Sequence, residues 1–199
     1  MGSLIIFIAM ILVAGITASV LIQTMSSLQE QAMQTGLETI RDVSAGLKVT
    51  HISGYANVSQ IGQLAIFVAP SAASADLDLM QGYISLSDST KSVILIYNSS
   101  CFSSSISNGL FNTLNSSHLN SNEFGLIVIR DIDTSCNSTT PVINNGDLVV
   151  LLINTTKCFS GIGTRTEVLG NVIPEYGISG VIGFTTPSTF ANTIVDLQP

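Results

Sequence analysis

The chain has 199 residues, of which 46% are hydrophobic and only 10% are charged. Thirteen acidic residues against six basic ones give a formal net charge of −7. Without a basic surface to displace counterions from phosphates, the sequence excludes nucleic acid as a partner. The length allows one domain with a sizeable core and one additional element.

The N-terminal segment is apolar and uncharged. Residues 1–29 contain no Asp, Glu, Lys, Arg or His, and residues 4–22 are almost wholly apolar. A helix over residues 4–22 would be ~28 Å long at about 1.5 Å per residue, which is enough to cross a bilayer. Its large side chains represent roughly 20–40 kcal/mol of gross driving force for burial. We therefore expect it to lie in a membrane, in the core of an assembly, or in each in turn. The positions expected to pack are Leu4, Ile5, Phe7, Ile8, Ile11, Leu12, Val13, Ile16, Val20, Leu21, Met25 and Leu28.

The flanks of this segment do not match a removable signal peptide or an ordinary anchor. A signal peptide has a basic start and a shorter apolar core, whereas the first basic residue here is Arg41. A permanent anchor normally carries Lys or Arg close to one end. We expect either that a basic leader has been removed before Met1 or that the segment is not primarily an anchor.

Heptad-like spacing continues beyond the apolar segment. Intervals of three, four and seven residues predict a long helix that packs against other helices. They form two series, with a shift of face near residue 32: Leu21, Met25, Leu28 and Ala32, then Met33, Leu37, Ile40 and Leu47. We predict one helix from about residue 3 to about residue 50, ending at Gly54 rather than Gly46, because Lys48 suits a last turn. This gives a helical region over 1–54 and a second domain over 55–199. The alternative is a core helix of a soluble domain, but so long a helix does not fit inside the remaining chain.

The sequence of the second domain is typical of a β-protein. Short β-rich runs are divided by turn residues, and they predict strands at 63–69, 82–86, 92–98, 124–131, 147–154, 165–171 and 178–185. Asn145-Gly146-Asp147 is typical of a tight turn that leads into a strand, and the Ser/Asn-rich residues 99–122 favour an exposed loop. The regular spacing predicts an all-β sandwich or barrel, so the fold class is α+β, with one long helix and one β-domain.

Three cysteines, Cys101, Cys136 and Cys158, all fall in this β-rich part. Their spacing matches no zinc pattern. In an extracellular setting one disulfide could form, and we expect Cys101–Cys136, because both residues lie in long loops that flank the same strand. The alternative is three free, buried thiols.

Five asparagines match the Asn-x-Ser/Thr acceptor of N-glycosylation: Asn57, Asn98, Asn115, Asn137 and Asn154. Chance accounts for some of these matches in a chain so rich in Asn, Ser and Thr. All five nevertheless lie in or beside predicted loops, where a bulky glycan can be tolerated. We therefore expect an extracellular surface that carries N-linked glycans.

We find no catalytic constellation. His51 and His118 are the only histidines, and neither has a nearby Ser or Cys in a convincing setting for a nucleophile. Nucleophile elbows, phosphate loops and zinc-protease signatures are all missing from the sequence. Asp131, Asp133 and Asp147 could converge on a divalent cation if their two strand ends meet, but solvated loop carboxylates are the simpler interpretation. The sequence predicts a protein that is not an enzyme and has no cofactor.

The apolar N-terminus and several later motifs together resemble the archaeal flagellins, or archaellins. The N-terminal match is residues 2–14 (GSLIIFIAMILVA). Later matches are residues 145–149 (NGDLV), 165–168 (RTEV), 172–175 (VIPE) and 184–188 (FTTPS), and residues 64–70 followed by Asp76 and Leu77. The match covers both ends of the chain and much of its middle. Residues 99–122 resemble nothing in the family, as expected for a variable outer face.

This resemblance implies a type IV pilin-like subunit with one long N-terminal helix and an immunoglobulin-like β-domain. It implies a short basic leader that a prepilin-peptidase-like enzyme removes, and a chain that waits in the membrane before it polymerises. The product would be the archaellum, an extracellular helical filament that a motor and its platform rotate for motility. The partners would be further copies of this chain and other flagellins. The family usually has one or two residues before the position of Met1, so the leader is cut directly before Met1 or the start is trimmed.

Two other functions fit parts of the sequence. An adhesive pilin of the same superfamily would be built alike, and only the C-terminal motifs favour the archaellin over it. A membrane-anchored extracellular β-domain that binds a ligand would be a monomer in detergent and would carry a basic flank, which residues 1–40 lack.

Overall fold

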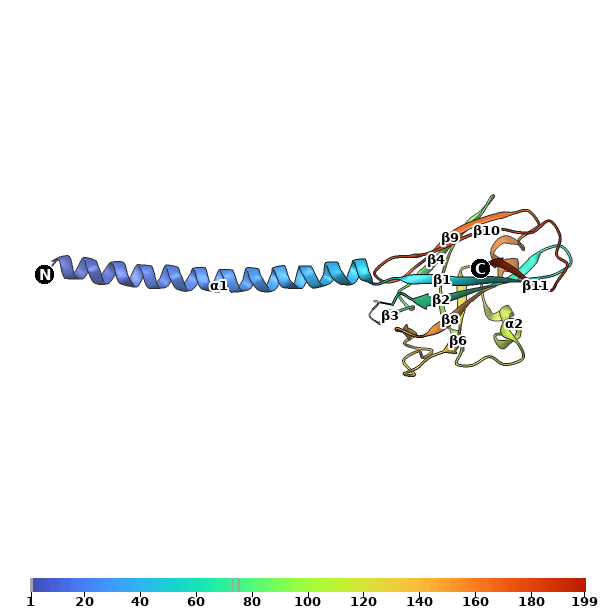
Figure 1. Ribbon diagram of the computed structural model, residues 1–199, viewed down its shortest axis with the longest axis horizontal. Helices are drawn as coiled ribbons and strands as arrows, with labels where there is room; N and C mark the ends of the chain where they lie inside the picture. Colours follow the sequence, from blue (N-terminus) through green and yellow to red (C-terminus); the bar gives the residue numbers. More distant parts are fainter. Residues whose placement is uncertain (1, 73, 75) are drawn as a thin grey trace. The chain divides into compact units, whose positions relative to one another are not determined.

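The computed structural model of the chain describes residues 2–72, 74 and 76–199, so the expectation about Met1 lies outside the described residues. The chain forms two units, Met1–Ile40 and Arg41–Pro199, and each is described by itself. The elements in chain order (Figure 1) are α1 (Gly2–Ser44), β1 (Leu47–Ala56), β2 (Ile61–Pro70), β3 (Leu77–Asp78), β4 (Tyr83–Asp88), β5 (Ser92–Ser103), α2 (Leu110–Thr113), the 3-10 helix η1 (Ser116–His118), β6 (Glu123–Arg130), β7 (Val142–Ile143), β8 (Leu148–Ile153), α3 (Thr155–Phe159), β9 (Glu167–Ile173), β10 (Gly180–Thr185) and β11 (Ile194–Gln198).

The expected end of the helix at Gly54 is wrong, and a boundary between residues 54 and 55 falls inside β1. Helix α1 ends at Ser44, and Gly46 then forms a parallel bridge with Ile178. A Cβ atom at Gly46 would lie only 2.8 Å from the carbonyl oxygen of Ile178, so glycine permits this close approach. The β-branched run that follows favours a strand, and its antiparallel pairing with β2 outweighs the helical spacing of Leu47.

A nine-stranded sheet forms most of the β-domain, in the order β10-β9-β4-β5-β6-β8-β2-β1-β11, and β3 pairs with β7 in a separate two-stranded sheet. Neighbouring strands are antiparallel except for the parallel pair β5 and β6. The sheet curls until β10 lies against β1 and β11, and the backbone N–H of Gly183 donates to the side-chain oxygen of Gln198 at 3.0 Å. The result is a nearly closed barrel, which confirms the predicted α+β class with a long helix followed by a β-domain.

All seven predicted strands are present as β2, β4, β5, β6, β8, β9 and β10, with ends shifted by a few residues. The prediction missed β1, β3, β7 and β11. The tight turn at residues 145–147 is also present, and Gly146 there has a φ of +104°, which glycine adopts without strain.

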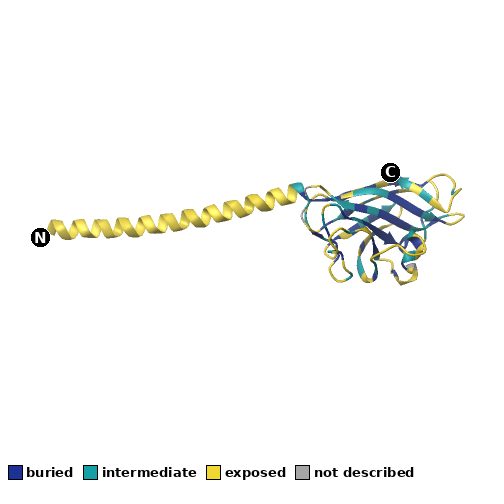
Figure 2. Ribbon diagram, turned by 60° about the horizontal axis from the view of Figure 1, so that its bottom comes forward, coloured by how far each residue is buried: buried dark blue, intermediate teal, exposed yellow. Residues whose placement is uncertain are grey.

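The core fills the inside of the barrel (Figure 2). It is built from alternate residues of the strands, such as Ile84 and Leu86 on β4, both fully buried. Strand β8 is apolar throughout and buried along residues 149–153, because one of its faces points into the barrel and the other is covered from outside. A strand with both faces covered has a continuous apolar run instead of alternation.

Residues 99–122 are not the exposed loop that their composition favours. Strand β5 continues to Ser103, and the following segment carries α2 and η1 to the start of β6. A parallel pair of strands requires such a crossover connection. Phe111, Leu114 and Leu119 of this segment are buried in a second cluster on the outside of the barrel, against Val150 and Leu152 of β8.

Candidate functional site

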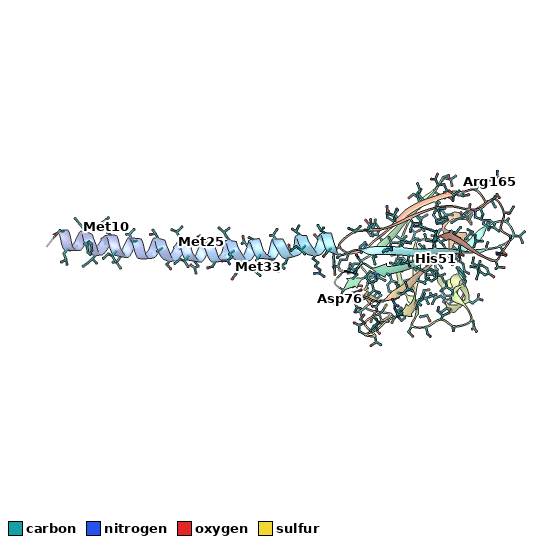
Figure 3. The ribbon with its side chains drawn as sticks, in the orientation of Figure 1. Met10, Met25, Met33, His51, Asp76 and Arg165 are labelled. Atoms are coloured by element: carbon teal, nitrogen blue, oxygen red, sulfur yellow. The ribbon has the colours of Figure 1, made fainter. Side chains whose placement is uncertain are left out.

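The largest unpartnered surface in the described chain is α1 itself. Helix α1 is 43 residues long and has no buried residue, and Figure 2 shows the exposed colour along nearly its whole length. All twelve positions predicted to pack are exposed, from 50% at Ile8 to 70% at Met25. Figure 3 shows Met10, Met25 and Met33 projecting from the helix. Side chains of this kind leave water only when another chain or a lipid covers them.

Threonine hydroxyls of α1 are hydrogen-bonded to the helix backbone, as suits an apolar environment. The hydroxyl of Thr17 donates to the carbonyl of Val13 at 3.0 Å, and that of Thr24 donates to the carbonyl of Leu21 at 2.9 Å. These hydroxyls are therefore satisfied without water or a partner. A shallow groove on the helix is lined by Ile6, Ala9, Met10, Val13 and Ala14. Small residues in such a groove let a second helix approach closely.

By length and composition α1 could also cross a membrane, because its most apolar stretch of 18 residues has a mean hydropathy of 2.8. Its first charged residue is Glu30, so the apolar half could lie in lipid without burying a charge. The same half can be covered by lipid or by identical helices, since both surroundings are apolar.

The five acceptor asparagines differ in exposure. Asn57, Asn115 and Asn137 are exposed, and Asn98 is half-buried, where its side-chain amide donates to Glu123 at 2.7 Å. Asn154 is only 8% exposed. Its side chain caps α3 by accepting a hydrogen bond from the backbone N–H of Lys157. A side chain so little exposed and engaged in a cap is a poor acceptor, so we expect Asn154 to be unmodified in the folded chain.

The structure brings Asp131, Asp133 and Asp147 together. One carboxylate oxygen from each lies within 4.8 Å of the others. The reason is topological: β6 and β8 are antiparallel neighbours, and Arg130 at the end of β6 pairs with Leu148 at the start of β8.

Local hydrogen bonds hold this aspartate cluster in place. Asp147 is buried and accepts hydrogen bonds from the backbone N–H groups of Ile132 and Asn144. Hydrogen bonds from Ser135 and then Asn144 keep the pKa of Asp133 below its ordinary value. One oxygen of Asp131 is buried and accepts no hydrogen bond. Carboxylate oxygens are the ligands that hard divalent cations prefer, so the donor set fits such an ion.

The expected disulfide between Cys101 and Cys136 is not formed, and all three cysteines are free and buried. Cys136 belongs to the cluster inside the barrel, whereas Cys101 belongs to the cluster outside it. Two loops that flank one strand can thus place their side chains on opposite sides of the sheet. Burial raises the pKa of Cys136 to about 12 and that of Cys158 to about 11, so these thiols are poor nucleophiles.

Sequence reasoning missed a contact at the start of the second unit. The guanidinium carbon of Arg41 lies 4.0 Å from the ring centroid of Tyr176, a cation–π geometry. The hydroxyl of Tyr176 donates to the carbonyl of Asp76, and the backbone N–H of Ile178 donates to the carbonyl of Ala45 at 2.9 Å. Arg41 is the first basic residue of the chain. This isolated position is the only feature of the sequence that could have indicated the contact with Tyr176.

These features define a class of protein: a subunit whose β-domain has its own core and whose long apolar helix must be covered by something else. The family model for archaeal-type flagellin matches residues 1–184. The chain is 45% identical to flagellin B2 of Methanocaldococcus jannaschii, over 99% of this chain and 93% of that one. It is 40% identical to flagellin B5 of Pyrococcus abyssi, over 99% and 96%.

Solved structures agree with these matches. The crystal structure of archaeal flagellin FlaB1 from Methanocaldococcus jannaschii aligns with a TM-score of 0.70 and 33% identity, over 77% of this chain and 97% of that one. The archaeal flagellum of Methanospirillum hungatei aligns with a TM-score of 0.67 over 99% of this chain and 97% of that one, at 14% identity, which shows a shared fold. The chain therefore belongs to the archaeal-type flagellin family, and it is a structural subunit of the archaellum filament.

Proposed function

We propose that the chain polymerises through the apolar half of α1, which packs against the same helix of other copies to form the centre of a helical filament. Such contacts are heterologous, because one side of the helix meets a different side of its neighbour. A heterologous contact that does not close on itself generates an open helical polymer. The β-domain of each copy then faces outward, and the filament rotates to move the cell.

The observation that carries this proposal is the contrast between the two units. The β-domain buries most of its large apolar residues, and many are fully buried. Helix α1 buries none. Each large side chain contributes about 1.5–3 kcal/mol on full burial, so identical helices gain a large free energy by packing together. The charge-free sequence up to residue 29 lets them do so without burying charge.

The same helix would also let the chain pass from the membrane into the filament. We propose that a prepilin-peptidase-like enzyme first removes a basic leader and that α1 holds the chain in the membrane until assembly. Transfer from lipid to a helix bundle keeps the apolar surface covered throughout, whereas return through water exposes it. Dissociation is therefore slow, and contacts between each subunit and several neighbours slow it further. The archaellum motor and platform, other flagellins and N-linked glycans on exposed asparagines complete the expected partners.

Electron microscopy of filaments sheared from native cells, with helical reconstruction, tests this proposal. We expect a solid filament with α1 in a central helical bundle and the β-domain outside. Additional density on Asn57, Asn115 or Asn137 would identify glycans. A chain that stays in the membrane fraction and occurs in no filament would contradict the proposal and favour an anchored binding protein. Filaments that attach cells to surfaces but never rotate would favour an adhesive pilin.

A further inference from the structure

A groove on the outside of the barrel has no role in polymerisation through α1. It lies where β1, β2 and α3 meet η1, and we call it the β1–α3 groove. Its volume is about 380 Å³, within the range of about 300–1,000 Å³ that is usual for small-molecule sites. The residues that line it include Tyr55, Asn57, Gln63, Ser117, Asn154 and Lys157.

Strand pairing places two of these side chains together. Tyr55 and Gln63 pair directly across β1 and β2, so their side chains lie on the same side of the sheet. That side is the outer one, because Tyr55 packs against the cluster outside the barrel, with its ring centroid 5.4 Å from that of Phe111. The ammonium group of Lys157 in α3 donates to the carbonyl of Ser117 in η1 at 2.7 Å. This hydrogen bond joins the two short helices that line the groove.

The β1–α3 groove combines an aromatic ring with groups that can hydrogen-bond, and this combination suits a sugar. One face of a sugar ring carries C–H groups that can stack on Tyr55, whereas its hydroxyls need hydrogen-bond partners. Lys157 has three N–H protons, of which one is donated to Ser117. The side-chain oxygen of Gln63 is buried and accepts no hydrogen bond within the part of the chain that the structure describes. A sugar hydroxyl that donates to this oxygen removes the cost of an unsatisfied polar group.

The sequence supplies an occupant for the groove in the form of a glycan on Asn57. Asn57 begins the acceptor motif of residues 57–59, follows the end of β1 and is exposed. Its backbone N–H donates to the carbonyl of Gln60 at 2.8 Å, so a tight turn holds the acceptor in place. Asn154 is the other acceptor that lines the groove, but it is only 8% exposed. A sugar attached to Asn57 therefore begins at the edge of the groove.

We propose that the first sugar of an N-linked glycan on Asn57 binds in the β1–α3 groove, with one face against Tyr55 and its hydroxyls on Gln63 and Lys157. This inference rests on the N-linked glycans of the proposed function and adds the place where one of them is held. The side-chain nitrogen of Asn57 bonds to the anomeric carbon of an activated sugar, and the phosphate carrier of that sugar leaves with the amide proton. Because attachment gives the sugar a high effective concentration, even a weak contact with the groove is occupied.

The reactivity of Lys157 tests the proposal. An N-hydroxysuccinimide ester acylates accessible amines, and mass spectrometry measures the rate at each lysine of the full chain, taken from native cells and solubilised in detergent. We expect Lys157 to react roughly tenfold more slowly than in Asn57→Gln, because a sugar bound for about nine-tenths of the time leaves it free for one-tenth. Lys91 is the internal control. Its ammonium also donates to a backbone carbonyl, that of Cys158 at 2.6 Å, and its rate should not change.

Two further variants show whether the glycan itself is the cause. Ser59→Ala removes the acceptor motif without altering Asn57, and it should raise the rate at Lys157 as much as Asn57→Gln does. Asn137→Gln removes an acceptor that does not line the groove, and it should leave this rate unchanged. Circular dichroism of each variant in detergent checks that the β-domain folds.

Thermal unfolding provides a second measurement. We expect Ser59→Ala to lower the unfolding temperature of the full chain in detergent by about 2–4 °C. Lys157→Met keeps the apolar stem of the side chain but removes the ammonium group. In a chain that already carries Lys157→Met, Ser59→Ala should have a smaller effect, because a contact shared by both residues is lost only once. Additive shifts would show that the sugar does not touch Lys157 and would overturn the proposal.

The outcomes separate this inference from the proposed function. If Asn57 carries a glycan and Lys157 reacts equally fast with and without it, binding in the groove is rejected while the N-linked glycans remain. A native chain without a glycan on Asn57 overturns the inference and removes Asn57 from the acceptors. If Lys157 stays slow in both Asn57→Gln and Ser59→Ala, something other than this glycan covers it, such as a free saccharide, and the proposal is wrong. Polymerisation through α1 depends on none of these results.

Discussion

Replacing Val13 with Asp tests the central claim that the apolar half of α1 is buried against other copies. Val13 lies in the middle of residues 4–22 and is 61% exposed in the isolated chain. Burying a valine stabilises by about 1.5 kcal/mol at the lower end of the range for large apolar side chains. Burying an unpaired carboxylate costs about 3–5 kcal/mol. Each subunit therefore loses roughly 4.5–6.5 kcal/mol of assembly free energy, which is about three to five powers of ten in its association constant.

The assay is the yield of sheared filaments from cells that express only the Val13→Asp chain, measured by electron microscopy and immunoblot. We expect no filaments. Aspartate at the centre of a membrane helix costs about 2.5–3.5 kcal/mol for insertion, so the membrane fraction must also be examined for the mature chain. Mature chain in the membrane without filaments places the defect at assembly.

Two control variants isolate the cause. Val13→Asn keeps the shape of aspartate without its charge, and it should weaken assembly less than Val13→Asp. Gln34→Asp introduces the same charge between Glu30 and Glu38, where α1 already carries carboxylates, and it should leave filaments intact. Normal filaments from Val13→Asp would falsify the reasoning, because a helix that tolerates a carboxylate at its apolar centre is not buried there.

Further predictions concern the β-domain. Mass spectrometry of filament peptides should find Asn154 unmodified, because it is 8% exposed and caps α3, and a glycan on Asn154 would contradict this. Burial raises the pKa of Cys136 to about 12 and that of Cys158 to about 11, from an ordinary 9.0. Thiols of the unfolded chain release protons first, so the free energy of unfolding should fall as pH rises from about 9 to about 12, and a flat profile in this window would show that these thiols are not buried. Millimolar Ca²⁺ should raise the unfolding temperature of the chain above that in EDTA, because a cation offsets the repulsion among three carboxylates within 4.8 Å. Asp133→Asn should shrink this difference, and equal melting of the native chain in Ca²⁺ and EDTA would show that hydrogen bonds alone hold the cluster.

The sequence predicts a helix or strand correctly where the spacing of its apolar residues matches the surface that the element covers in the folded chain or is expected to cover in an assembly. The apolar run of α1 and the strands β2 and β8 are strongly patterned, and they were located to within a few residues. Strand β1 was missed because Leu47 fits a helical interval, while the pairing with β2 that makes it a strand involves residues distant in sequence. Strand β11 depends in the same way on its pairing with β1.

The candidate sites are limited in the same way, because they depend on contacts between residues that are distant in sequence. Convergence of Asp131, Asp133 and Asp147 could be anticipated, because adjacent antiparallel strands place the end of one beside the start of the next. The pairing of Cys101 with Cys136 could not be judged, because it depends on which side of the sheet each side chain occupies. The burial of Asn154 likewise depends on α3, a helix of five residues that leaves no periodic signal in the sequence.

The low charge content of the chain has a structural reason in the packing of its helix α1 against copies of itself. In a polymer of identical chains every charge is repeated at each subunit, so a charge within a contact surface destabilises the polymer at every repeat. The apolar half of α1 carries none, whereas the aspartates at 131, 133 and 147 gather where β6 ends and β8 begins. A chain of net charge −7 can thus remain soluble on its outer loops while it packs closely against copies of itself. If this segregation is what permits packing, a charge placed in the apolar half of α1 should weaken the filament even though the β-domain, which has its own core, still folds.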